Sequence, residues 1–168
     1  IFMITEHNID GIDASGNRAQ WEINALKKNE FPDVTLIDKF DETKIKEVTN
    51  GIVHAQQLSG RFLNNAKYIV DAHGLEYDAS SHLSHGYPVY SWRKWAFIAK
   101  SYHYKKLENK IFQNSQHVIC AGENIYEKVK NIQNATVVRN AVFVKNYKPT
   151  DCKILKVALV GPFLQGKI

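Results

Sequence analysis

The chain alternates short apolar runs with longer segments of helical periodicity. Six runs rich in β-branched and aromatic residues predict buried strands, at 1–5, 34–37, 51–54, 67–71, 117–121 and 136–138. Between them, apolar residues recur at helical spacing in four segments, at 17–29, 57–65, 91–114 and 123–131. Strands that alternate with helices predict an α/β, Rossmann-like three-layer domain, with a mainly parallel sheet between two layers of helices.

The texture changes after residue 138. A polar stretch that contains Pro149 is followed by one more apolar run at 154–161. We expect the first domain to cover 1–148, with a linker and a further strand in 149–168. Because the chain opens on Ile1 rather than Met, we also expect it to be part of a longer protein.

The composition excludes only a few classes of protein. The 168 residues are 44% hydrophobic, which suits a globular domain, and the formal charge of +5 favours anionic partners. The two cysteines stand far apart without a CxxC motif, so neither a disulfide framework nor a zinc knuckle is expected. No run approaches the length of a membrane span, and no signal peptide is visible. Together these features predict a cytoplasmic protein.

The stretch IVDAHGLEYD, at 69–78, is the main candidate for chemistry. An apolar run ends there in Asp71, His73, Glu76 and Asp78, around Gly74. In doubly wound sheets the carboxyl ends of the strands face the ligand crevice, so this cluster is expected at a binding site. Taken singly, the three carboxylates are more typical of solvated or helix-capping residues, and a histidine at a strand end is often structural.

The loop after the first strand is a second candidate. It reads EHNIDGIDASG, at 6–16, and Gly11 and Gly16 could let the backbone approach a phosphate ahead of a helix. The spacing is not that of the GxGxxG fingerprint, so the pattern alone is weak.

The order of these motifs resembles a known family. It runs from the glycine loop through GIVHAQQLSG, DAHG, LENKIF and HVICAGENI to VVRNAV and VALVGPFLQGK. In this order the chain resembles the amino-terminal, acceptor-side half of the group-1 retaining glycosyltransferases, which have two Rossmann-like domains in the GT-B fold. The resemblance implies transfer of a sugar, with retention, from a nucleotide-sugar donor to a saccharide or lipid-linked acceptor. It implies no metal cofactor and no nucleic-acid partner.

The resemblance also implies roles for single residues. His73 matches the histidine that meets the donor sugar, and is the expected catalytic residue. Gly16 matches the loop that passes the donor diphosphate, and Glu108 matches a glutamate on the long helix. Glu76 and Asn140 are expected to contact the acceptor or to support the site.

The end of the chain departs from the family pattern. Lys167 stands six residues after Gly161, where the family places a lysine that holds the donor pyrophosphate. Pro162 and Ile168 replace the arginine and the glycine of that pattern. The resemblance places 149–168 as the linker and first strand of a second domain that binds the nucleotide sugar. Without that domain, this segment is expected to be inactive.

Three other functions stay open. The domain could be a non-catalytic Rossmann-like module that binds a phosphorylated or anionic ligand, a reading that Pro162 favours. The spacing of Asp71, His73, His82 and His85 would allow a metal site, although the segment YDASSHLSHGYP looks like a mobile polar loop. The basic charge and many aromatic residues would suit nucleic acid, but no recognised motif supports that.

The long helix at 91–114 has two apolar faces. Phe97, Tyr104, Leu107 and Ile111 share one, which is expected to join the core. The other carries Trp95, Ile98 and Tyr102, among six lysine and arginine residues that include Lys94. We expect Lys94, Trp95 and Tyr102 to contact either an anionic membrane or a lipid-linked acceptor, which would place the protein peripherally at the inner face of a membrane. The alternative is that this face packs on a neighbouring helix or on a second domain.

Overall fold

A six-stranded parallel sheet forms the centre of the domain. The computed structural model describes residues 1–5, 14–29, 33–37, 44, 48, 51–63 and 67–139. Within these ranges the strand order is β2-β1-β3-β4-β5-β6, and every neighbouring pair is parallel. The strands are β1 (Phe2–Ile4), β2 (Thr35–Ile37), β3 (Val53–Gln56), β4 (Tyr68–Ala72), β5 (His117–Cys120) and β6 (Ala135–Val137). The predicted α/β class and parallel sheet are therefore confirmed.

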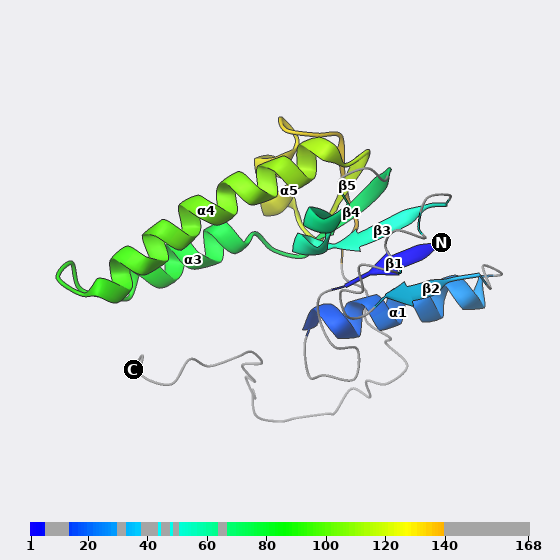
Figure 1. Cartoon of the computed structure of the whole chain (residues 1–168), viewed down its shortest axis with the longest axis horizontal. Coiled ribbons are helices and arrows are strands. Elements are labelled where there is room, and N and C mark those ends of the chain that lie inside the picture. Colours follow the sequence, from blue (N-terminus) through cyan, green and yellow to red (C-terminus); the bar gives the residue numbers. More distant parts are fainter. Residues whose placement is uncertain are drawn as a thin grey trace, which may run out of the picture.

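Helices flank the sheet on both faces (Figure 1). One face carries α1 (Ala14–Lys28), and the opposite face carries α4 (Trp92–Asn114) and α5 (Glu123–Val129). The 3₁₀ helix η1 (Gln57–Phe62) connects β3 to β4, and α3 (Glu76–His85) follows β4. No described helix is long and apolar enough to cross a membrane.

Alternation along the strands divides the core into two parts. Tyr68, Val70 and Ala72 of β4 join the larger cluster, together with Ile111 and Phe112 of α4. On the other face, Met3 of β1 packs against Ala19 and Ile23 of α1 in a smaller cluster. Strand residues at odd and even positions point to opposite faces, so Asp71, between Val70 and Ala72, lies on the α1 side.

Two sequence-based expectations were wrong, and a third was correct only in part. Residues 76–85 form α3 rather than a mobile loop, since α3 packs along the length of α4 (Figure 1). Gly16 lies inside the first turn of α1, not in the loop before it, because the helix already begins at Ala14. The segment expected as a helix at 57–65 is a single 3₁₀ element that ends at Phe62. The predicted linker and strand at 149–168 lie outside the described residues.

Helices α3 and α4 form a hairpin, residues 76–114, that extends beyond the sheet (Figure 1). Its base is fixed by Glu108 of α4, whose carboxylate accepts the backbone N–H groups of Glu76 at 2.7 Å and Tyr77 at 3.3 Å. These donors belong to the first turn of α3 and have no partner within the helix. Higher up, the Ser101 hydroxyl donates to the Tyr77 carbonyl at 2.7 Å. The start of α3 is therefore tied to the middle of α4.

Candidate functional site

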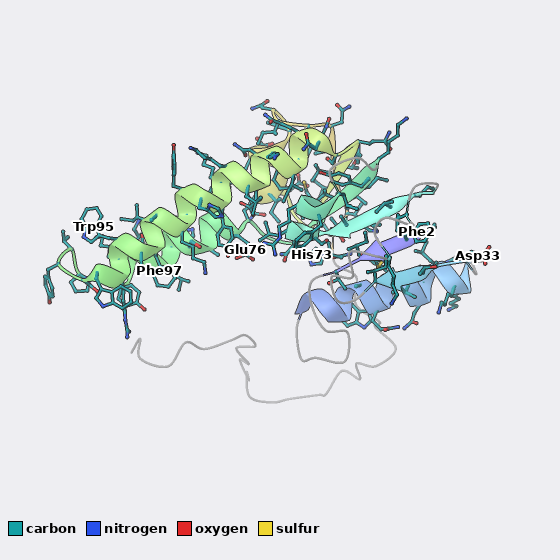
Figure 2. The ribbon with its side chains drawn as sticks, viewed as in Figure 1. Phe2, Asp33, His73, Glu76, Trp95 and Phe97 are labelled. Carbon is teal, nitrogen blue, oxygen red and sulfur yellow. The ribbon has the colours of Figure 1, made fainter. Side chains whose placement is uncertain are left out.

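A cavity of about 370 Å³ opens at the carboxyl ends of β4 and β5. Its walls come from the loops after β4 and β5, from α3 and from α5: His73, Gly74, Leu75, Asp78, Ala79, His82, Ala121, Gly122, Asn124, Ile125 and Lys128. This is the edge at which parallel α/β sheets bind ligands. Figure 2 shows His73 where the hairpin joins the sheet.

His73 lies beside Asp71 at this edge. The Asp71 carboxylate is fully buried, and its Oδ2 lies 3.1 Å from His73 Nε2, without the alignment of a hydrogen bond. The His73 side chain is itself only 12% exposed. With Nε2 beside the carboxylate, Nδ1 is the ring nitrogen that does not face Asp71. The expectation that Asp71 is solvated was wrong. The alternation of side chains along β4 places Asp71 on the face of the sheet that α1 covers, where it is buried.

Asp71 also joins a polar cluster on the α1 side: Glu22, His54, Gln56 and Asp71. His54 lies 3.9 Å from Glu22 and 4.0 Å from Asp71, and the Gln56 amide donates to Glu22 at 2.8 Å. Glu22, His54 and Asp71 each offer a ligand atom within 4.8 Å of the others, so they could hold a divalent cation. Among the described residues this is the set with such geometry, and the predicted metal set is not assembled.

Part of this cluster could have been predicted from the sequence. His54 and Gln56 stand at alternate positions of a strand that is otherwise buried and apolar. In the parallel register Gln56 pairs with Asp71, so the polar side chains of β3 and β4 fall on one face. Glu22 could not have been found this way, because it comes from α1, and only the packing of that helix brings it to the strands.

The charge of Asp71 affects its neighbours. Burial raises the pKa of the Cys120 thiol to about 11, with the Asp71 carboxylate as a further cause. The thiol therefore stays protonated at neutral pH and is a poor nucleophile.

On the cavity side, Lys128 pairs with Asp78 at 2.8 Å, and this contact raises the lysine pKa. The described cavity thus combines a cation, a carboxylate and imidazoles.

The other predicted site residues are dispersed. Glu76 is in the first turn of α3, next to the cavity but not in its wall, and Gly16 is in α1. His82 lines the cavity with its ring mostly exposed, whereas His85 stacks edge-on against it without joining the wall. Lys94, Trp95 and Tyr102 lie on α4, in the outer part of the hairpin. Asn140 and Lys167 lie outside the described residues.

The fold and the cavity define an α/β domain with a parallel sheet and a ligand cavity at the carboxyl ends of its strands. Comparison of the chain with protein-family models, with curated proteins and with solved structures gives no match.

Proposed function

We propose that this domain is the acceptor-side half of a retaining glycosyltransferase that uses a nucleotide-sugar donor. The observation that carries the proposal is the position of His73, in the wall of an open cavity at the strand ends and 3.1 Å from a buried carboxylate. The order of sequence motifs that resembles the group-1 enzymes supports the same function. In that proposal the GT-B partner domain supplies most of the donor contacts.

The chemistry of transfer gives His73 a definite task. As the bond to the leaving diphosphate breaks, positive character grows at the anomeric carbon and negative charge grows on the phosphate. With Nε2 of His73 beside Asp71, the other ring nitrogen can donate or accept one hydrogen bond at the sugar.

The test uses the protein expressed from its complete reading frame. Release of nucleoside diphosphate is measured with a panel of nucleotide sugars, with and without saccharide and lipid-extract acceptors. We expect His73→Ala to lower transfer by one to three orders of magnitude, as for a lost contact of roughly 2 to 4 kcal/mol. His85→Ala is the matched control, because it removes an exposed histidine of α3 that is outside the cavity wall.

The outcomes separate enzyme from binding module. Transfer that depends on His73 but not on His85 supports the proposal. Equal turnover in the wild type and in His73→Ala would refute the role of His73. If no donor is turned over while nucleoside diphosphates bind in calorimetry, the domain is the anionic-ligand module instead.

A further inference from the structure

Within the part of the chain that the structure describes, the outer part of the α3–α4 hairpin is not covered by the rest of the domain. The buried residues of α4 are Glu108, Ile111 and Phe112, all in its last two turns. The 23 residues of α4 span about 34 Å at 1.5 Å per residue, so most of its length projects past the sheet. Figure 2 shows Trp95 and Phe97 near the far end, well away from His73.

Large apolar side chains are concentrated on this projection. Nine large hydrophobic residues are exposed among the described ones, and six of these lie between 89 and 102: Val89, Tyr90, Trp92, Trp95, Ile98 and Tyr102. Tyr90 is 91% exposed, Trp92 74% and Trp95 58%. Such a cluster on one projection is unusual for a surface that faces only water, and marks an interaction site.

The charge of the same segment has one sign. From Ala79 to Leu107 the sequence contains no aspartate or glutamate, but five cations: Arg93, Lys94, Lys100, Lys105 and Lys106. Several cations rest on aromatic rings, with Lys106 Nζ 4.6 Å from the ring centre of Tyr102 and Lys100 Nζ 5.4 Å from that of Tyr104. Cations and exposed aromatic residues therefore both occur around the outer part of α4, on more than one of its faces.

The hairpin tip, residues 87–102, also contains a concave binding surface. Tyr87 and Phe97 stack with ring centres 5.7 Å apart, and with Trp92 and Ala96 they form the apolar wall of a cavity of about 340 Å³. Arg93 and Lys100 complete the lining. An apolar wall flanked by two cations suits an amphiphile with an anionic head group.

We propose that the hairpin tip docks on the surface of a bilayer that contains anionic phospholipids. Tryptophan and tyrosine favour the head-group region, where their rings are shielded from water while their polar atoms stay hydrated. Lysine and arginine add attraction to the negative surface. A soluble protein partner would need both apolar groups for the tip and negative charges for this run of cations. An anionic bilayer presents apolar chains and negative head groups at one surface. The proposal does not rest on glycosyl transfer.

The experiment measures co-sedimentation of the complete chain with vesicles rich in phosphatidylglycerol, and with vesicles of phosphatidylcholine alone. We expect binding to the anionic vesicles that weakens as salt is raised, because surface attraction is screened. Arg93→Gln with Lys100→Gln should lower the partition coefficient about 25-fold, at about fivefold for each charge. Trp92→Ala should lower it about tenfold or more, since an aromatic anchor is removed.

Matched controls come from α1, on the other side of the sheet. Lys27→Gln with Lys28→Gln removes two exposed cations, and Trp21→Ala removes an exposed tryptophan. Both should leave vesicle binding unchanged. Trp95 is avoided as a test position, because its indole N–H donates to the Val89 carbonyl at 3.0 Å and holds the turn of the hairpin.

Fluorescence gives a second measurement that needs no destabilising change. The chain has three tryptophans, so Trp21→Phe leaves only Trp92 and Trp95, both in the tip. Their emission should shift to the blue when anionic vesicles are added. Absence of both sedimentation and a blue shift overturns the proposal, as does equal loss of binding in the α1 controls. Binding to neutral vesicles as tight as to anionic ones would overturn the role of the cations.

Discussion

Glu108 makes the stability of the domain depend on pH in a direction opposite to that of most glutamates. Its side chain is buried, and burial raises its pKa from 4.5 to about 7. The N–H groups of Glu76 and Tyr77 favour the ionised form and lower the pKa, but burial outweighs them. Between pH 4.5 and 7 the folded protein therefore binds a proton that the unfolded chain has released.

The sign of the effect follows from that proton. The stabilisation is complete below the pKa of the unfolded chain and is lost as the pH rises through about 7. At about 1.4 kcal/mol for each pKa unit, the shift corresponds to about 3 kcal/mol in the free energy of unfolding. Glu108→Gln removes the titration and keeps one carbonyl oxygen that can accept the Glu76 N–H.

The assay is urea unfolding, followed by circular dichroism at intervals from about pH 4 to about pH 9, on the wild type and Glu108→Gln. We expect the stability of the wild type to fall by about 3 kcal/mol relative to the variant as the pH rises, with the change centred between 4.5 and 7. Glu127→Gln is the control, because it makes the same change at an exposed glutamate of α5. A difference between the wild type and Glu108→Gln that does not change with pH would show that the two N–H donors keep Glu108 ionised, and would refute the reasoning.

Two packing features give further predictions. A Cβ at Gly60 would lie 2.7 Å from Ile111 Cγ2 and 3.1 Å from Tyr68 Cε2, so Gly60→Ala should lower the free energy of unfolding by about 1 to 3 kcal/mol. Gly74→Ala is its matched control: nothing lies within 4 Å of the added carbon, and chemical denaturation should show no loss. The Gln133 amide donates to the carbonyl of Ser115, just beyond the end of α4, and Gln133→Ala should cost about 1 to 2 kcal/mol, measured by thermal unfolding.

The sequence predicted the strands well because the sheet is parallel. Both faces of such strands are buried, so each strand reads as an apolar run, and all six expected runs overlap an observed strand. Segment 76–85 was wrongly predicted to be a loop, because its sequence carries little local signal for a helix. It is rich in serine and histidine and offers only weak helical periodicity, and α3 forms because Glu108 caps its start and α4 packs along it. That stabilisation comes from tertiary contacts, which local pattern does not contain.

In the candidate site, too, the sequence predicts local features but not those that depend on tertiary contacts. His73 could be placed at a strand end from the sequence, since strand ends are visible in the hydrophobic pattern. The carboxylate beside its ring belongs to Asp71, and the burial of Asp71 depends on the side of the sheet on which the alternation along β4 places it. The cluster with Glu22 depends on one further step, the packing of α1 across β1 and β3. Each of these features depends on more tertiary contacts than the one before it, so it is harder to predict from the sequence.

The orientation of the hairpin on a membrane depends on which side of α4 meets the lipid. Trp95, Ile98, Tyr102 and Lys106 stand at spacings of three and four residues, so they share one face over about three turns. Glu108, at the base near the cavity, follows Trp92 by sixteen residues, or about 24 Å of helix. A hairpin standing on its tip would hold the cavity at that height, whereas one lying on the stripe would bring the cavity close to the lipid.

The two orientations depend on different cations, and this makes a separate prediction. At 100° per residue Arg93 and Lys100 lie on the side of α4 opposite to the stripe, so a hairpin lying on the stripe would hold them away from the lipid. Docking through Arg93 and Lys100 therefore favours a hairpin that stands on its tip. Lys106→Gln with Lys110→Gln changes cations near the base, and we expect this pair to leave partition onto anionic vesicles unchanged. A loss of about 25-fold in this pair, at about fivefold for each charge, with no loss in Arg93→Gln and Lys100→Gln, would mean that the hairpin lies on the stripe. On its tip, the hairpin holds the cavity about 24 Å from the surface, the distance that a lipid-linked acceptor would have to reach.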